Sequence, residues 1–303
     1  QYTSIRGENS SLKNITCGVP QGSILGPLLF IILINDLPNA SKFFSILYAD
    51  DTTLEMSSNN LRKLYLEANV ELDKISDWFK ANKLTLNISK TKYILFRDRN
   101  QHVDFIDHKL NIERKEIERI GEDCKEKYFK FVGVHLDEHL SWHYHIKHIN
   151  RKVANANYAL SKLKNLLPIK VKYTIYNSLI KSHIEYNLSC WGKVKSKEIE
   201  KIIVLQKRAV RYIANLKYNS HTGQTFKNLN ILKFNDLVNL KQATFMYRYA
   251  NDKLPSSFKD VFSKLSNFDR SLSLELPKTK KASLKLQLSF SMIKIWNELP
   301  LHI

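Results

Sequence analysis

Two aspartates, Asp50 and Asp51, stand next to each other in "SILYADDTTLEM", residues 45–56. The short runs on either side are rich in apolar, aromatic and β-branched residues, which predicts two strands with the acidic pair at their turn. Adjacent carboxylates repel each other and a turn does not require two of them, so the pair favours a site that holds a cation. An Asx-rich hairpin turn without a cation is the alternative.

Two further motifs flank this pair along the chain. "VPQGSILGPLLF" (residues 19–30) turns through Pro20, Gln21 and Gly22 and continues as an apolar helix that ends before Pro38. "LTLNISKTKYILF" (residues 84–96) is typical of two short strands divided at residues 89–91. Between these motifs, the apolar residues of segment 59–80 recur at three- and four-residue steps, which predicts one amphipathic helix.

Taken in this order and spacing, the three motifs resemble the reverse transcriptase of non-LTR retrotransposons, of the LINE type and especially jockey-like. The later stretches "FVGVHLDEHLSW", "SLIKSHIEYNLSCWG", "LQKRAVRYI" and "IWNELP" resemble downstream parts of the same family. The resemblance implies an RNA-directed DNA polymerase that extends a DNA 3′-hydroxyl with dNTPs on an RNA template. It also implies two Mg²⁺ ions, or Mn²⁺ in their place, with RNA template and DNA primer as partners.

Nucleotidyl transfer by two metal ions explains why carboxylates are needed, because hard cations prefer oxygen ligands. Strand side chains alternate between faces, so Asp50 and Asp51 do not converge unless the turn bends sharply between them. By resemblance Asp50 is the direct ligand and Asp51 supports it or ligates more weakly. The implied site residues are the catalytic Asp50, Asp51 and Lys90, the metal ligands Asp50 and Asp51, and the substrate-binding Gln21, Gly22, Ser23, Tyr48, Phe131 and Gly133.

Each of these residues also has a structural interpretation. Gln21, Gly22 and Ser23 line the nascent base pair by resemblance, but they equally suit a turn that begins a helix. Lys90 suits the protonation of leaving pyrophosphate, with Lys92 as a fallback, or it is an exposed lysine at a strand end. The stretch "FKFVGV" (residues 129–134) resembles a primer grip, and its aromatic residues would be partly core in either interpretation.

A third carboxylate is missing from this pattern. In the family, the first palm aspartate lies well upstream of the "PQG" element, and neither Glu8, in a turn-like stretch, nor Asp36, at a helix end, matches it. The chain begins with Gln1, which predicts a piece cut from a longer protein without its fingers. We therefore expect the fragment alone to be inactive. A catalytically dead nucleic-acid-binding remnant is the alternative, and a maturase of the group II intron type has no matching segment.

The charge is unevenly distributed along the chain. The formal net charge is the number of Lys and Arg residues less the number of Asp and Glu residues. It is 19 − 20 = −1 for residues 1–140 and 29 − 9 = +20 for residues 141–303, which gives the total of +19. A long basic half without low-complexity repeats favours a folded surface that meets a polyanion. In "LQKRAVRYI" we expect Lys207, Arg208 and Arg211 to contact nucleic-acid phosphates from a helix. A merely solvated basic face is the alternative.

Secondary-structure signals change at the same place as the charge. Strands are expected up to "YFKFVGVHL" (residues 128–136), and helices over 141–167, 169–187, 197–217 and 233–250. The expected fold class is α+β: the C-terminal part of a polymerase palm, with a mostly antiparallel sheet backed by helices, then a mainly helical thumb and downstream segment. The expected domains are residues 1–139 (palm), 140–220 (thumb-like) and 221–303 (helical and loop-rich).

Several other features restrict the function. The longest apolar run, "LLFIILI" at residues 28–34, is too short to span a membrane and predicts a buried helix. Three dispersed cysteines support neither a disulfide framework nor a zinc knuckle, and they favour a reducing, intracellular compartment. The family resemblance implies the nucleus during integration and the cytoplasm otherwise. His139 and His143 have the spacing of a helical zinc pair but lack the accompanying Glu and Cys. We expect instead a helix capped by Ser141 with its histidines on the polar side.

Overall fold

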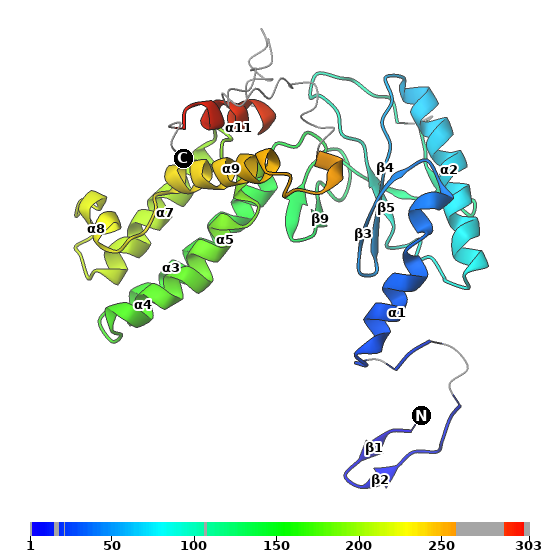
Figure 1. The fold of residues 1–303 in the computed structure, drawn as a ribbon, viewed down its shortest axis with the longest axis horizontal. Coiled ribbons are helices and arrows are strands. Elements are labelled where there is room, and N and C mark those ends of the chain that lie inside the picture. Colours follow the sequence, from blue (N-terminus) through cyan, green and yellow to red (C-terminus); the bar gives the residue numbers. More distant parts are fainter. Residues whose placement is uncertain (1, 15–17, 21, 106–107, 259–287, 300–303) are drawn as a thin grey trace. The chain divides into compact units, whose positions relative to one another are not determined.

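The computed structural model describes residues 2–14, 18–20, 22–105, 108–258 and 288–299 (Figure 1). The chain forms two compact units, Gln1–Ile120 and Gly121–Ile303, and each is described by itself. The division into domains at residues 139 and 220 stays a prediction. Among the described helices, none is both long and apolar enough to cross a membrane.

The first unit combines two long helices with short strands, in agreement with the predicted α+β class. The two strands predicted on either side of Asp50 and Asp51 and the helix predicted within segment 59–80 are confirmed. Residues 84–89, by contrast, form turns and extended backbone and are not a strand. The elements are β1 (Ser4–Ile5), β2 (Glu8–Asn9), α1 (Leu25–Ile34), η1 (Leu37–Ala40), β3 (Phe44–Tyr48), β4 (Asp51–Glu55), α2 (Leu61–Ala81), β5 (Lys92–Ile94), β6 (Asn111–Ile112), β7 (Lys115–Glu116) and β8 (Glu118–Ile120).

The strands of the described part pair two by two and do not form the single, mostly antiparallel sheet that was predicted. β3 pairs with β4 in an antiparallel hairpin, whereas β5 pairs with β8 in parallel. Most of these strands are only two or three residues long, and each of them pairs with a single neighbour. The prediction of an α+β class is therefore right, and the prediction of one continuous sheet is wrong for the described residues.

Helix α2 supplies the core of the first unit. Asn60 caps its N-terminus by accepting a hydrogen bond from the Lys63 N–H. Ala68, Leu72 and Ile75 are buried, as their spacing predicts. They pack in one cluster with Ile34, Leu37, Phe43, Ile112 and Ile117. Removing these side chains from water drives the association of α2 with η1 and the short strands.

Helix α1 is less buried than its composition predicts. It is apolar on every side, yet only Gly26 and Ile34 are buried among its residues, and Ile32 is 63% exposed. Phe30 is half-buried and packs with Ile34 against the core of this unit. The prediction of a helix is confirmed, but the prediction that it is buried is wrong in the described structure, because one face alone has a packing partner.

The second unit is mainly helical, and the four helical segments predicted for it are confirmed. The expected segment 169–187 comprises an α-helix, one π-helical stretch and a further helical turn. The elements are β9 (Phe129–Phe131), β10 (Val134–Leu136), α3 (His143–Leu163), α4 (Ile169–Tyr176), η2 (Asn177–Lys181), α5 (Ser182–Glu185), α6 (Leu188–Trp191), α7 (Lys197–Ile213), α8 (Gly223–Asn228), α9 (Phe234–Ala250), η3 (Ser256–Phe258) and α11 (Leu288–Asn297).

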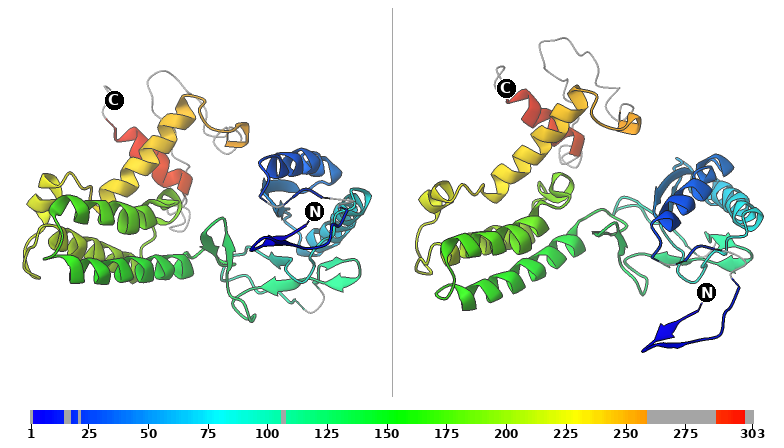
Figure 2. Two further views of the ribbon diagram at one scale, coloured as in Figure 1. Left: turned by 90° about the horizontal axis from the view of Figure 1, so that it is seen from below. Right: turned by 60° about the horizontal axis from the view of Figure 1, so that its bottom comes forward.

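Helices α3 and α7 run side by side and form the centre of this unit (Figures 1 and 2). Between them, the Asn150 amide donates to the Glu198 carbonyl and the Asn157 amide to the Leu205 carbonyl, both at 2.9 Å. Trp191 and Tyr176 are completely buried beside them. Burial of the Tyr176 phenol raises its pKa to about 12. The amphipathic pattern of the sequence thus corresponds to one continuous helical core.

Helix α3 differs from the sequence prediction at its start. Its cap residue is Trp142, in the left-handed conformation, and Ser141 accepts a hydrogen bond only from the His143 N–H. His145 is fully buried and stacks edge-on against Trp191, with ring centroids 5.6 Å apart. His135, from β10, is also buried. The prediction that the histidines lie on a polar face is therefore wrong for these two, because they fill the core between the hairpin and α3.

Candidate active site

The Asp50–Asp51 pair lies at the tight turn of the β3–β4 hairpin. Tyr48 pairs with Asp51 across the hairpin, so Ala49 and Asp50 form a two-residue loop between the strands. Ala49 has a φ of +52°, and this left-handed residue reverses the chain immediately before the aspartates. Asp50 therefore belongs to the loop and Asp51 is the first residue of β4. The left-handed residue precedes both aspartates, and the convergence of their two carboxylates on one cation stays a prediction.

The hairpin presents these groups to solvent. Tyr48, Asp50 and Asp51 are all exposed, whereas Leu47 and Leu54 pack against the core of the first unit. Because Tyr48 and Asp51 are direct cross-strand partners, their side chains share one face of the hairpin. The opposite face anchors the hairpin, which leaves the turn accessible to a ligand.

The carboxylates of Asp50 and Asp51 are ligands of a suitable type for a magnesium ion. Mg²⁺ is often bound by one or two carboxylates together with waters and substrate phosphates. The two carboxylates do not complete a two-ion site by themselves. In the described part of the chain, the only three His, Cys, Asp or Glu side chains grouped closely enough to share a metal ion are Glu122, Glu138 and His139. No third carboxylate of the described residues joins Asp50 and Asp51 at the turn.

The Gly22–Ser23 element begins helix α1. Gly22 has a φ of +85° in open surroundings, so the backbone conformation itself favours glycine there. The Ser23 hydroxyl accepts a hydrogen bond from the Gly26 N–H at 3.0 Å, which makes Ser23 part of the helix start. Gln21 lies outside the described residues. In Figure 1 the beginning of α1 and the turn of β3–β4 lie toward the same end of the first unit.

The "NISKT" turn is organised by Asn87. Its side-chain oxygen accepts hydrogen bonds from the Ser89 hydroxyl at 2.7 Å and the Lys90 N–H at 3.3 Å. The Lys90 side chain is exposed. Lys92 instead forms an ion pair with Glu118 at 3.2 Å, between the parallel strands β5 and β8. Of the two lysines considered from the sequence, Lys90 is thus the one that the turn leaves accessible.

Comparison with known proteins agrees with these motifs. Residues 1–136 match the family model for reverse transcriptase (RNA-dependent DNA polymerase). This part of the chain is therefore similar to reverse transcriptases. The chain is 26% identical over 254 residues to the RNA-directed DNA polymerase from mobile element jockey of Drosophila melanogaster, which covers 80% of this chain and 26% of that protein.

A second relative is similar to the chain at the same level of identity. The probable RNA-directed DNA polymerase from transposon BS of Drosophila melanogaster is 26% identical over 238 residues, or 75% of this chain and 25% of that protein. The chain therefore spans about a quarter of the length of these curated relatives. No solved structure matches the chain.

The segment that matches the reverse transcriptase model ends near the β9–β10 hairpin, where the sequence predicted a primer grip. Phe131 pairs with Val134, so Val132 and Gly133 form a two-residue loop with φ of +42° and +85°. Two positive φ values are the signature of a type I′ turn, which suits glycine at its second position. The ring of Tyr186 packs on Gly133, and its hydroxyl donates a hydrogen bond to the Val132 carbonyl.

The three cations predicted on helix α7 differ in their surroundings. The Arg211 Nε donates to the Ser220 carbonyl at 2.8 Å, and Arg208 donates to the Tyr218 hydroxyl at 3.2 Å while stacking on that ring. Both arginines thus anchor the loop that follows α7. Lys207 is exposed and lines a pocket. Contact with nucleic acid stays a prediction for all three, and Lys207 is the most accessible of them.

Sequence reasoning missed residues that hold these turns in place. Tyr186 had no signal other than an aromatic residue at the end of the helix predicted over 169–187. Gly26 is confined, because an added Cβ would come within 2.9 Å of the Ser23 hydroxyl oxygen, and the "GP" step at a helix start is the only sign of this. Asp137 accepts hydrogen bonds from the N–H groups of His139 and Ser141 and from the Ser141 hydroxyl. It thereby closes the turn that precedes α3.

Proposed function

We propose that this chain carries the catalytic turn of an RNA-directed DNA polymerase of a non-LTR retrotransposon. The proposed reaction extends a DNA 3′-hydroxyl with dNTPs on an RNA template. The observation that supports it is the exposed Asp50–Asp51 turn, held on the β3–β4 hairpin within the segment that matches the reverse transcriptase model. By family inference the chain acts inside the cell, in the nucleus during integration.

The residues of the hairpin have distinct proposed roles. Asp50, in the loop, is the direct metal ligand, and Asp51, at the start of β4, supports or completes the coordination. When bound, Mg²⁺, or Mn²⁺, neutralises the triphosphate and lowers the pKa of the primer hydroxyl. Tyr48 shares the face of Asp51 and offers an aromatic surface to the incoming nucleotide.

The other predicted site residues contribute positioning and proton transfer. Lys90, exposed on the turn that Asn87 organises, stabilises or protonates the leaving pyrophosphate. Gly22 and Ser23, with Gln21, line the nascent base pair at the start of α1. Phe131 and Gly133 contact the primer end through the β9–β10 turn. Residues 1–139 are the palm portion, 140–220 the thumb and 221–303 the downstream segment.

The test is primer extension by a chimeric enzyme. Residues 1–136 replace the corresponding stretch of the jockey RNA-directed DNA polymerase, and extension of a DNA primer on an RNA template is measured with Mg²⁺ and dNTPs. We expect the chimera to extend the primer and Asp50→Asn to reduce the rate by at least about a thousandfold, because a carboxylate ligand is lost. Asp77→Asn, an exposed aspartate on α2, is the matched control and should leave the rate unchanged.

A second function has one observation in its favour. The excess of positive charge over residues 141–303 is what a catalytically dead nucleic-acid-binding remnant would also show. The chimera separates the two functions, because a remnant would bind primer and template without extending the primer. Extension that survives Asp50→Asn would instead refute the metal role of the turn.

A further inference from the structure

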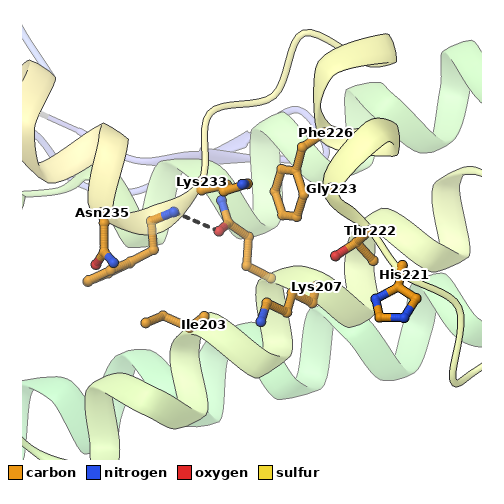
Figure 3. A pocket seen from close by; sticks show the side chains of 10 residues that line it. Ile203, Lys207, His221, Thr222, Gly223, Phe226, Lys233 and Asn235 are labelled. Carbon is orange, nitrogen blue, oxygen red and sulfur yellow. Dashed lines mark hydrogen bonds between the residues drawn. The ribbon is translucent and has the colours of Figure 1, made fainter.

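A pocket of about 340 Å³ lies in the second unit among helices α7, α8 and α9 (Figure 3). Its apolar surface comes from Ile203, Phe226 and Phe234. Both phenylalanines are buried in the helical core, so this wall is rigid. The volume is at the small end of the range for ligand sites, about 300 to 1,000 Å³. It suits one compact, flat group and does not suit a helix or strand of a partner.

The polar part of the lining is basic. Lys207, Lys233 and His221 come from three different places in the chain, and no carboxylate lines the pocket. In Figure 3, Lys207 on α7 and Lys233 lie on opposite sides, with Thr222 and His221 at one end. Both lysines are exposed, so their long side chains can reach a ligand at the opening. The pocket therefore combines an apolar interior with a positive rim.

One wall is fixed by Gln206. Its side-chain oxygen accepts from the Phe234 N–H at 2.9 Å, and its amide donates to the Tyr176 hydroxyl at 3.0 Å and the Leu232 carbonyl at 2.9 Å. Gln206 is 1% exposed, and with these bonds its amide is fully engaged. It therefore holds α7 and α9 at a set separation and keeps the pocket open.

The other wall is fixed by the arginines of α7. Arg211 binds the Ser220 carbonyl and Arg208 binds Tyr218, so the loop that carries His221 and Thr222 is held against the helix. Thr222 is buried, and its hydroxyl points toward the centre of the pocket in Figure 3. Ligand sites whose walls are fixed in advance lose less conformational entropy when they bind.

We propose that this pocket binds one nucleotide of a single-stranded nucleic acid, with its base against Ile203 and Phe226 and its flanking phosphates on Lys207 and Lys233. Single-strand binding sites combine cations that follow the backbone with apolar and aromatic surfaces that receive bases. The excess of positive charge over residues 141–303 brings such a polyanion to this unit. The proposal does not depend on the chemistry of Asp50 and Asp51.

The test uses the 303-residue chain and two fluorescent probes of equal length. One is a single-stranded oligonucleotide, and the other is the same phosphodiester chain without bases. Ile203→Trp fills the pocket without changing the charge. We expect it to weaken binding of the oligonucleotide about tenfold, the effect of losing one base contact, and to leave binding of the base-free chain unchanged. Val204→Trp, on an exposed neighbour outside the pocket, is the matched control and should change neither.

A double variant tests the cations. Lys207→Gln with Lys233→Gln should weaken binding of both probes and reduce the slope of log K against log salt by about 1.4, or 0.7 for each lost phosphate contact. The control pair Lys217→Gln with Lys227→Gln removes the same charge from exposed positions outside the pocket. Equal losses in both pairs, or equal effects of Ile203→Trp on both probes, would overturn the proposal. Far-UV circular dichroism verifies folding, and Ile203→Phe replaces Ile203→Trp if that variant fails to fold.

Discussion

The Tyr186 hydroxyl donates a hydrogen bond to the Val132 carbonyl, across 54 residues of sequence. This bond joins the turn of β9–β10 to the segment between α5 and α6, and the Tyr186 ring covers Gly133 in the same turn. The Trp191 indole N–H in turn donates to the Tyr186 carbonyl at 3.0 Å. The turn proposed to contact the primer is therefore attached to the buried centre of the helical unit.

Removing the hydroxyl of Tyr186 should loosen this turn. Tyr186→Phe keeps the ring over Gly133 but deletes the hydrogen bond, so we expect the second unit to lose about 1 kcal/mol of unfolding free energy. Gly133→Ala should cost about the same or more, because alanine disfavours a φ of +85°. Denaturant unfolding and hydrogen exchange of the hairpin amides measure both effects. Tyr158→Phe, at an exposed site on α3, is the control, and an equal loss there would contradict the assignment.

The sequence predicted the elements that depend on local patterns, but it did not predict contacts between distant segments. The strands around Asp50 and the helix α2 are confirmed because alternation and three- to four-residue spacing are local signals. The exposure of α1 could not be predicted, because an apolar run does not reveal whether it has partners. The same holds for Tyr186, whose contact lies 54 residues away.

The histidines show the same limit in the second unit. A helix with several histidines near its start predicts a polar surface, but the fold places His145 against Trp191 and His135. The burial of His135 and His145 depends on the packing of strand β10 against helix α3, and a local sequence pattern does not reveal this packing. Likewise, the helix predicted over 197–217 is confirmed as α7, but the sequence did not show that Arg208 and Arg211 would anchor the next loop.

The buried His145 predicts that acid destabilises the second unit. Burial, with the nearby rings of His135 and His148, lowers its pKa from about 6.5 to about 4. The folded state thus favours the neutral His145 imidazole. The second unit keeps its full stability above pH 6.5 and loses part of it as the pH falls toward 4. Between these values the unfolded chain binds more protons, so unfolding free energy should drop by about 2 kcal/mol at pH 5.

Two neighbouring histidines also make the folded second unit less stable as the pH falls. The pKa values of His135 and His148 are also lowered, chiefly by burial and then by nearby cationic groups. Denaturant unfolding between pH 7.5 and 4.5 measures the whole effect. His145→Phe should remove a large part of the pH dependence, whereas His143→Gln, at an exposed position, should retain it. An unchanged slope in His145→Phe would show that other groups are responsible.

Substitutions along helix α1 should lower the unfolding free energy by different amounts at buried and exposed positions. Ile34 is 3% exposed and packs in the core of the first unit, so Ile34→Ala should cost about 2 to 4 kcal/mol of unfolding free energy. Ile32 is 63% exposed, and Ile32→Ala should change the stability by no more than about 0.5 kcal/mol. Thermal and denaturant unfolding of the chain compare the two. Similar losses at both positions would mean that the exposed face of α1 is covered in solution.

The basic half predicts strongly salt-dependent binding. If about four to six phosphates are neutralised, the slope of log K against log salt for a primer–template duplex should be roughly −3 to −5. A polypeptide of residues 121–303 should retain this slope, because it contains the excess charge. Fluorescence anisotropy from 50 to 200 mM salt measures it. The first unit, residues 1–120, is the comparison, and binding there that equals the second unit would refute the assignment.

The 303-residue chain by itself should not catalyse primer extension. Two carboxylates at one turn supply too few ligands to fix two cations and neutralise a triphosphate. We therefore expect no measurable primer extension on an RNA template with dNTPs and Mg²⁺ or Mn²⁺, even where the duplex is bound tightly. The matched positive control is the chimera with the jockey polymerase. Robust extension by the chain alone would mean that another carboxylate completes the site, and Glu8→Gln and Asp36→Asn would then identify it. Extension unaffected by Asp50→Asn would be more serious, because it would remove the reason for two adjacent carboxylates at the turn.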